Sequence, residues 1–187
     1  MRITIAGMPG SGKSTVSRFL EKKFGLKRYN MGELRRRMAT ERGMTVQELN
    51  KLGEKEAWTD KDVDDYQKNL AKEDDFVIDG RLSWFFIPDS IKIFLKVDPK
   101  IGAERIFQEQ RGEERGEKKW KNAGEVERFN EERLKSDVKR YESLYHINPY
   151  KLENYDIIID TSGMTIEEMN RTVEKAISKF IEENKDI

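Results

Sequence analysis

The stretch Gly7-Met-Pro-Gly-Ser-Gly-Lys-Ser-Thr15 decides the fold, because it fits the pattern G-x-x-x-x-G-K-[ST]. An apolar run, residues 3–6, precedes it, and apolar residues at helical spacing follow it. This context predicts a strand, a glycine-rich turn and the start of a helix. Such a turn aims consecutive backbone N–H groups and the positive end of the helix dipole at one point. The stretch therefore predicts a phosphate site.

Each residue type in this loop has a physical role at a phosphate site. Glycines allow backbone angles and a close approach that a side chain would block. The ammonium of Lys13 is placed to contact the β- and γ-phosphates of a nucleotide, and the hydroxyl of Ser14 is suited to binding Mg²⁺. We therefore expect the loop to bind a nucleoside triphosphate. Its residues are Gly7, Met8, Pro9, Gly10, Ser11, Gly12, Lys13, Ser14 and Thr15.

Length and composition limit the possible classes of protein. A chain of 187 residues is long enough for one ordinary domain with a sizeable core. Its 36 basic and 36 acidic residues balance, so gross charge does not favour a nucleic-acid partner. The absence of cysteine excludes disulfides, zinc-thiolate sites and cysteine nucleophiles. No segment reads as a signal peptide or a membrane span, so we expect a cytoplasmic protein. We also expect a monomer.

The order of elements along the chain predicts an α/β fold. Short runs rich in strand-forming residues alternate with helical stretches, which favours a parallel sheet with right-handed crossovers. The predicted strands are residues 3–6, 26–30, 76–79, 91–97 and 155–160. Helix starts are marked by capping boxes at Thr45 and Thr165 and by the pair Asp98-Pro99. We expect a three-layer sandwich with the sheet between helices.

Two segments interrupt this predicted core. Residues 32–72 read as helical and polar, and residues 111–124 are charged with almost nothing to bury. A segment with little to pack is expected to move. We interpret 32–72 as an insert that binds an acceptor and 111–124 as a lid, both within a single domain of residues 1–187.

The sequence Asp79-Gly80-Arg81 lies at the carboxyl end of a predicted strand. Ligands bind at this edge of open α/β sheets. Asp79 could hold Mg²⁺ directly or through water, Gly80 would let a phosphate approach the backbone, and Arg81 could contact two oxygens of an acceptor phosphate. The alternative is that Asp79 caps a helix and Arg81 forms a surface ion pair.

The predicted helix 125–145 carries an apolar stripe and, beside it, Arg133, Asp137 and Arg140. Two arginines seven residues apart on one face could span a pair of phosphates, and Arg111 and Arg115 could close on them from the lid. Phosphoryl transfer needs such positive charge around the phosphate oxygens. Ion pairing with nearby glutamates explains any one of these arginines equally well.

Together these motifs resemble the nucleoside monophosphate kinases, and most closely the archaeal-type cytidylate kinases. The likeness runs along nearly the whole chain. It rests on the phosphate loop, the Gly32-Glu33 helix with Arg36, the Asp79-Gly80-Arg81 strand end, the Arg133…Asp137…Arg140-Tyr141 helix and the terminal Tyr155-Asp156…Asp160-Thr161-Ser162 segment.

The resemblance implies a P-loop kinase that moves the γ-phosphate of ATP to CMP or dCMP with Mg²⁺. It implies that residues 7–15 hold ATP, that Lys13 neutralises charge on the transferred group, and that Ser14 and Asp79 position Mg²⁺. Arg36 and Arg81 match positions expected at the acceptor phosphate. Arg133 and Arg140 match arginines expected to straddle both phosphates. Arg111 and Arg115 are looser matches in a variable lid.

The residues that select the acceptor base cannot be copied from related branches. Bacterial cytidylate kinases follow Asp-Gly-Arg with another Asp, where this chain has Leu82 and Ser83. Adenylate kinases place their arginine two residues further on. Asp60, Asp64 and Gln67 of the insert could read a cytosine edge, although a solvated helix face explains them at least as well.

Two other classes of function remain open. One is a small P-loop kinase acting on AMP, UMP or a metabolite such as shikimate or dephospho-coenzyme A. The other is a nucleotide-binding switch with a protein or RNA partner, for which residues 35–37 and 118–121 are candidate basic patches. Balanced charge and the set of arginines placed to face phosphates favour the enzyme.

Overall fold

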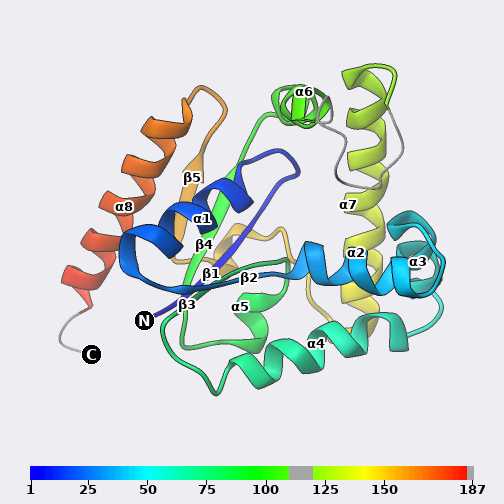
Figure 1. Cartoon of the computed structure of the whole chain (residues 1–187), viewed down its shortest axis with the longest axis horizontal. Coiled ribbons are helices and arrows are strands. Elements are labelled where there is room, and N and C mark those ends of the chain that lie inside the picture. Colours follow the sequence, from blue (N-terminus) through cyan, green and yellow to red (C-terminus); the bar gives the residue numbers. More distant parts are fainter. Residues whose placement is uncertain (110–119, 185–187) are drawn as a thin grey trace.

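The structure is a computed structural model that describes residues 1–109 and 120–184. In that part of the chain, five strands form one parallel sheet in the order β2-β3-β1-β4-β5 (Figure 1). The strands are β1 (Arg2–Gly7), β2 (Lys27–Asn30), β3 (Phe76–Asp79), β4 (Ile91–Lys96) and β5 (Ile157–Asp160). Each one matches a predicted run to within two residues, so the predicted α/β fold is confirmed.

Helices join the strands and cover the sheet. They are α1 (Lys13–Phe24), α2 (Met31–Glu41), α3 (Val46–Gly53), α4 (Trp58–Leu70), α5 (Ser83–Phe86), α6 (Pro99–Glu109), α7 (Ala123–Tyr145) and α8 (Ile166–Glu183), with a 3-10 turn at Leu152–Asn154. The capping boxes at Thr45 and Thr165 both form. Asp98 accepts a hydrogen bond of 2.9 Å from the backbone N–H of Lys100, as its position before Pro99 predicts. The short helix α5 was not predicted.

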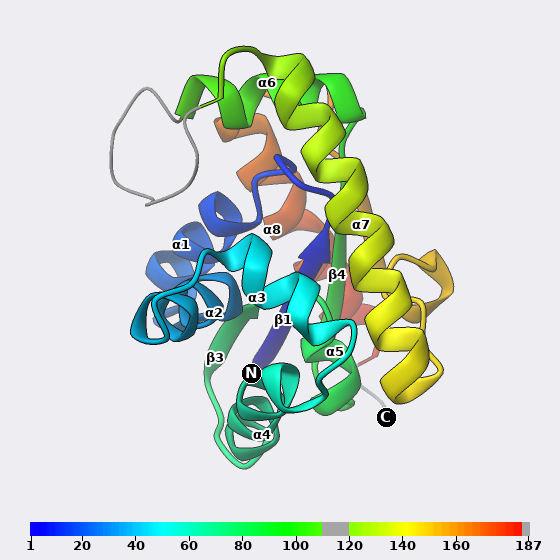
Figure 2. The same cartoon turned by 90° about the vertical axis from the view of Figure 1, so that its right-hand side faces the viewer.

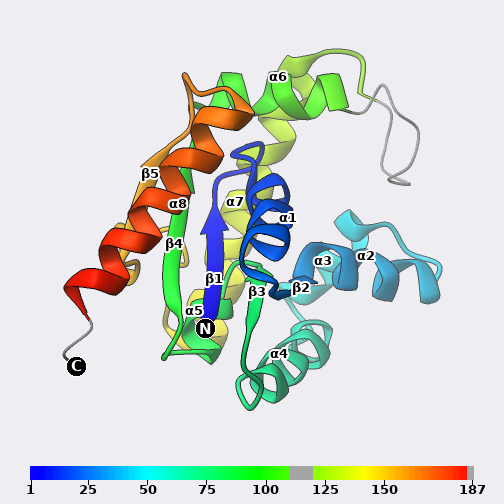
Figure 3. The same ribbon diagram turned by 60° about the vertical axis from the view of Figure 1, so that its left-hand side comes forward.

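Different helices cover the two faces of the sheet, because successive side chains of a strand point to opposite faces. Ile3, Ile5 and Val77 belong to a core cluster that includes α1 and α8. Phe76 and Ile78 of β3 point the other way and pack against the helices α2, α3 and α4. Figure 3 shows α1 and α8 in front of the sheet and α7 behind it. The predicted three-layer arrangement is therefore present.

The segment 32–72 is better packed than its polar sequence suggests. Its three helices bury Met38, Leu49, Val63 and Leu70 in a core cluster shared with β3. Each helix therefore contributes one apolar face, and the segment lies beyond the β2 edge, on the right in Figure 1. Across the described ranges, no helix combines the length and the apolar composition needed to cross a membrane.

Parallel pairing brings several strand ends together at one edge of the sheet. Asp79 at the end of β3 is in register with Asn30 of β2 on one side and with Ile5 of β1 on the other. Beyond Ile5, β1 enters the turn that leads to α1. Figure 2 shows α7 crossing the molecule from α6 toward α5, alongside α3. This edge is where the candidate site lies.

Candidate active site

The loop between β1 and α1 has the backbone of an anion site. Gly10 and Gly12 adopt φ of 74° and 87°, a region that favours glycine. A Cβ on Gly10 would lie 2.2 Å from the carbonyl oxygen of Gly102, so no side chain fits there. The N-cap residue of α1 is Gly12, which has no side chain to cap the first turn. The free N–H groups of that turn are therefore available to an anion.

Lys13 lies folded over this loop. Its ammonium donates hydrogen bonds to the carbonyl oxygens of Gly7 (2.9 Å) and Met8 (2.7 Å). Burial, reinforced by the positive charges of Arg81 and Arg133, lowers the pKa of Lys13 to about 7. A bound anion opposes this shift, since a neighbouring negative charge favours the charged ammonium. The local electrostatics therefore suit a polyanionic ligand.

Next to Lys13, oxygen atoms from two different elements come together around Asn30. The side-chain amide of Asn30 donates to Asp79 Oδ2 (3.0 Å) and to Ser14 Oγ (3.3 Å). Its carbonyl oxygen accepts from the backbone N–H of Glu33 (2.7 Å) and so caps α2. Asn30 thereby ties the start of the insert to Ser14 and Asp79. Sequence reasoning missed Asn30, which it placed only at the end of the predicted strand 26–30.

The pair Ser14 and Asp79 fits a magnesium ion in donor chemistry. Asp79 also accepts from Ser17 Oγ (2.8 Å), and burial raises the pKa of its carboxyl group. A cation would offset that burial, and Mg²⁺ takes hard oxygen ligands from one or two protein groups while phosphates and water supply the rest. In the described ranges, no group of three or more His, Cys, Asp or Glu residues is placed to hold a metal by itself.

Arg81 is held by an ionic contact within the molecule. It forms an ion pair with Asp137 of α7, and its Nε donates to the hydroxyl of Tyr150 (3.1 Å). The same hydroxyl donates to Asp137 (2.8 Å). Burial alone would raise the pKa of Asp137, but the charges of Arg81 and Arg140 hold it below its usual range. Arg81 therefore lies at the predicted edge with its position fixed by α7.

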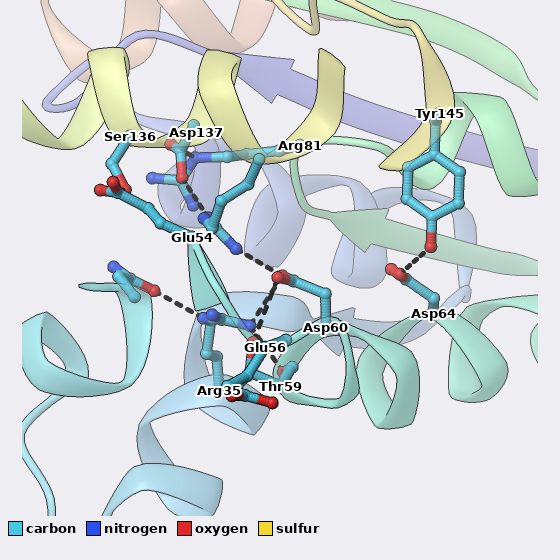
Figure 4. A network of polar contacts seen from close by, with 12 residues as sticks. Arg35, Glu54, Glu56, Thr59, Asp60, Asp64, Arg81, Ser136, Asp137 and Tyr145 are labelled. Carbon is cyan, nitrogen blue, oxygen red and sulfur yellow. Dashed lines mark hydrogen bonds and ion pairs between the residues drawn. The ribbon is translucent and has the colours of Figure 1, made fainter. Parts of the chain in front are cut away.

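A buried chain of alternating charges continues from Asp137 into the insert (Figure 4). Arg140 donates to Asp137 (2.6 Å) and to Asp60 of α4. Asp60 also accepts from Arg35 of α2 (2.9 Å). The chain Arg35, Asp60, Arg140, Asp137 and Arg81 links three helices and the end of β3.

Helical spacing left open whether Arg140 reaches a phosphate or forms ion pairs, and in this structure it forms ion pairs with Asp60 and Asp137. Its side chain is 1% exposed and its guanidinium is used by Asp60 and Asp137. A buried guanidinium needs paired carboxylates, and α4 supplies one of them. Arg35 is likewise buried, so residues 35–37 do not form one exposed basic patch. Of the second candidate patch, 118–121, residues 118 and 119 lie outside the described residues.

A pocket lies between the insert, the end of β3 and α7. Its lining includes a positive group, Arg81 and Arg133, and a set of polar groups on α4, Asp60, Asp64 and Gln67. The remaining lining residues are Met31, Gly32, Arg35, Val46, Val63, Gly80, Leu82 and Tyr141. Arg36 is half-buried beside it, with a guanidinium nitrogen 3.6 Å from where a Cβ on Gly32 would lie. Of the predicted lid residues, Arg111 and Arg115 lie outside the described residues.

Asp64 is a buried carboxyl group at this pocket. It is 3% exposed and accepts a hydrogen bond from the hydroxyl of Tyr145 on α7. Burial raises the pKa of Asp64 to about 6, although the hydrogen bond from Tyr145 lowers it. The sequence alone does not reveal this contact, because Asp64 and Tyr145 lie 81 residues apart.

Replacing Asp64 with asparagine is expected to stabilise the protein at pH 7. Because the folded state raises the pKa of Asp64 to about 6, ionising this group costs no folding free energy below about pH 4; the cost grows between about pH 4 and pH 6 and is full above pH 6. The cost is about 3 kcal/mol at most. Thermal unfolding from pH 4 to pH 8 should show an advantage of Asp64→Asn in Tm that grows as the pH rises from about 4 to 6 and levels off above that.

The matched control is Asp65→Asn, which makes the same change on the same helix. Asp65 is half-exposed and pairs with Lys68 at the surface, so its replacement should leave Tm nearly unchanged. An advantage of Asp64→Asn that is equal at pH 4 and pH 8 would contradict the cost assigned to the buried charge.

Comparison with known proteins shows similarity over nearly the whole chain. Residues 3–135 match the model of a protein family described as an AAA domain. The cytidylate kinase of Methanopyrus kandleri is 34% identical over 191 residues, covering 96% of this chain and 94% of that protein. The cytidylate kinase of Methanocaldococcus jannaschii is 33% identical, covering 96% and 99%. That of Methanothrix thermoacetophila is 38% identical, covering 86% and 88%.

Solved structures share the fold at lower identity. An uncharacterised protein from Eubacterium ventriosum has a TM-score of 0.69 at 17% identity, covering 95% of this chain and 98% of that chain. Shikimate kinase from Bacteroides thetaiotaomicron has a TM-score of 0.63 at 18% identity, covering 95% and 98%. A gluconokinase from Sinorhizobium meliloti has a TM-score of 0.62 at 14% identity, covering 97% and 94%. These likenesses concern the fold alone.

Proposed function

This chain belongs to the cytidylate kinase family, and on that premise we propose which of its residues carry the transfer of the γ-phosphate of ATP to CMP or dCMP. One observation carries the assignment. Arg81 and Arg133 line the pocket beside the insert, and together with burial their charges lower the pKa of Lys13 in the phosphate loop. The charges of Arg81 and Arg133 would therefore act both on a triphosphate in the loop and on a monophosphate in the pocket.

The donor half of the site is the loop of residues 7–15. Backbone N–H groups at the start of α1 bind the β- and γ-phosphates of ATP, and the glycines keep the approach to the backbone open. Lys13 leaves the carbonyl groups of Gly7 and Met8 to contact the transferred phosphoryl group. Its ammonium then neutralises charge that develops on the oxygens of that group.

Ser14 and Asp79 are the residues that would hold Mg²⁺ beside the loop. Bound there, the ion would neutralise negative charge on the β- and γ-phosphates. Asn30 keeps both oxygen ligands in place, because its amide contacts each of them while its carbonyl is fixed by the cap of α2. The start of the insert is thus coupled to the donor site through one side chain.

The acceptor half is the pocket between the insert and α7. Arg81 binds the phosphate of CMP, with Gly80 giving it access to the backbone and Arg36 approaching from α2. Arg133 stands between donor and acceptor, since it lines the pocket and its charge reaches Lys13. Arg140 acts differently: it is buried, and it holds Asp137 and Asp60 so that Arg81 and α4 keep their positions.

The reaction needs no nucleophilic side chain. An oxygen of the CMP phosphate attacks the γ-phosphorus of ATP, a new P–O bond forms, and the bond to the β-phosphate oxygen breaks to release ADP. The protein aligns two anions that repel each other and supplies compensating charge. Closure of the insert 32–72 over both substrates would keep water from taking the phosphoryl group.

Replacing Arg81 with alanine is expected to raise the KM for CMP by about 10- to 100-fold, because charge-assisted hydrogen bonds to the acceptor phosphate are lost. The Kd for ATP should change by less than about twofold, because the donor loop makes its contacts without Arg81. Initial rates across CMP concentrations and calorimetric titration with ATP separate the two effects.

Arg128→Ala is the matched control for this division of roles. Arg128 is an exposed arginine of α7 whose Nε contacts only its own helix, at Gly124 O (3.4 Å), among the contacts described. Its removal should alter neither constant. If Arg81→Ala weakened ATP binding as much as CMP use, Arg81 would not be an acceptor residue.

A further inference from the structure

We propose that Asp64 and Gln67 of α4 select the acceptor base: Asp64 accepts a hydrogen bond from the exocyclic amine of cytosine, and Gln67 donates one to the ring nitrogen N3. The proposal rests on the proposed function, since it assigns the atoms that read the base in the acceptor pocket. It also assigns Ser83 and Tyr145 as positioning residues that act through these two.

The residues that line the pocket include the kinds of groups that contact a nucleotide. Arginines lie where the phosphate is proposed to bind, and the apolar side chains of Met31, Val63 and Leu82 offer walls for a flat base. Asp64 and Gln67 are three residues apart on α4, so they lie on one face of that helix. Figure 4 shows the carboxyl groups of Asp64 and Asp137 on different sides of Asp60. Asp64, which is proposed to contact the base, is thus separated from Asp137, which pairs with Arg81.

Ser83 fixes which end of the Gln67 amide faces the base. Its hydroxyl donates to Gln67 Oε1 (2.7 Å), and both side chains are buried. The Nε2 group of Gln67 therefore points toward Asp64 Oδ1, at 3.4 Å. That distance makes a weak hydrogen bond, so the N–H groups remain available to a ligand. Ser83 comes close because Gly80 has no side chain: a Cβ there would lie 2.3 Å from Ser83 Oγ.

Tyr145 likewise orients the carboxylate of Asp64, which is the proposed hydrogen-bond acceptor for the base. Its hydroxyl donates to Asp64 Oδ2, which leaves Oδ1 beside Gln67 Nε2. Asp60 is the other carboxylate at the pocket, but it is already used: Oδ1 accepts from Arg35 and Arg140, and Oδ2 accepts from Thr59 Oγ1. Of the acidic residues of the insert that could read a base, the contacts single out Asp64.

The pocket therefore presents a hydrogen-bond acceptor, Asp64, beside a hydrogen-bond donor, Gln67. This pattern discriminates cytosine from uracil. Cytosine presents a donor amine beside the acceptor N3, which matches Asp64 and Gln67 in order. Uracil presents the acceptor O4 beside the donor N3–H. Its O4 would face a carboxylate, and its N3–H would face the N–H groups of Gln67. Neither hydrogen bond can form with uracil. Buried polar groups left without a partner cost binding free energy, so uracil should bind more weakly.

The test is a pair of substitutions that reverses this pattern without changing net charge, Asp64→Asn with Gln67→Glu. In Asp64→Asn alone, Tyr145 donates to the new amide oxygen, and the amide nitrogen can donate to O4 of uracil. The ratio of kcat/KM for CMP to that for UMP should fall by about 10- to 100-fold. In the double variant the ratio should fall further and UMP should become the better acceptor.

Ser83→Ala tests positioning separately from folding. Without the hydroxyl, the Gln67 amide can turn and offer its oxygen to N3–H of uracil, so the ratio of CMP to UMP use should fall. A purely structural role would lower both activities equally and leave the ratio unchanged. Because each ratio is measured within one protein, the folded fraction cancels. Asp65→Asn is the control and should keep the wild-type ratio.

The outcomes separate this inference from the proposed function. If the unsubstituted protein does not phosphorylate CMP, the proposed function itself is wrong. If the protein prefers CMP to UMP but Asp64→Asn, Ser83→Ala and the double variant keep that ratio within about twofold, the function stands and the assignment of the base readers is overturned. A fall in the ratio for all three variants, with UMP preferred by the double variant, supports it.

Discussion

Replacing Lys13 with alanine is expected to lower kcat by about 1,000-fold or more, the largest effect of any single change considered. Preorganised positive charge at a transferred group is worth about 100- to 1,000-fold per contact, and Lys13 is the ammonium of the loop. The fold should survive, because Lys13 contributes two hydrogen bonds to carbonyl groups while burial disfavours its charged form. Measuring kcat at saturating ATP and CMP, together with Tm, checks both expectations.

Lys22→Ala supplies the comparison for Lys13→Ala, since it makes the same change at an exposed position of the same helix. Lys22→Ala should retain wild-type kcat. If Lys13→Ala kept more than about a tenth of the activity with an unchanged Tm, Lys13 would not act on the transferred phosphoryl group.

Replacing Asp137 with asparagine is expected to reduce the free energy of unfolding by about 3–5 kcal/mol at pH 7. Asp137 is 1% exposed and pairs with both Arg81 and Arg140. Asparagine keeps the shape of the side chain but removes its negative charge. The positive charges of the two guanidinium groups then lose this partner. Urea unfolding of the variant and the wild type measures the difference.

The pH dependence of this difference has a defined sign. Despite burial, the two arginines lower the pKa of Asp137 in the folded state, so its charge stabilises the fold above the pKa of an unfolded aspartate, about 3.9. The stabilisation is lost as the pH falls through the lowered pKa. The gap between Asp137→Asn and wild type should therefore be full at pH 7 and shrink in acid.

Glu131→Gln shows what a surface pair of the same helix is worth. Glu131 is 64% exposed and pairs with Lys135, so its loss should cost less than about 1 kcal/mol. If Asp137→Asn were within 1 kcal/mol of wild type at pH 7, the charge chain would not hold the insert to α7.

Asp64 and Asp137 have opposite energetic roles around one pocket. Asp137 is surrounded by guanidinium groups and stabilises the fold, whereas Asp64 has a raised pKa and costs stability when it is ionised. A carboxylate whose ionisation costs stability is expected to serve a function that needs its charge. Reading the amine of cytosine supplies one, because a carboxylate accepts a stronger hydrogen bond than an amide oxygen does.

The parts of the site that are local in the sequence could be predicted from it. The phosphate loop needs only a strand, three glycines, Lys13 and Ser14 in order, and the edge position of Asp79 and Arg81 follows from a short apolar run. Parallel register then brings these segments together, as the pairing of Ile5 with Asp79 shows.

The contacts between distant segments could not be predicted. Helical spacing showed that Arg133, Asp137 and Arg140 share one side of α7, but not that Asp60 would meet Arg140 from 80 residues away. The same holds for Asn30, whose amide bridges Ser14 and Asp79 only once β2 pairs with β3. Which arginines contact substrate and which are consumed in ion pairs depends on packing that no local pattern encodes.

The most direct test of the account is the rate of ADP formation from Mg·ATP with one acceptor at a time: CMP, dCMP, UMP, AMP, shikimate and dephospho-coenzyme A. The account predicts that CMP and dCMP give the highest kcat/KM and are converted to the corresponding diphosphates. If CMP and dCMP were no better than AMP, the account of this site would be contradicted.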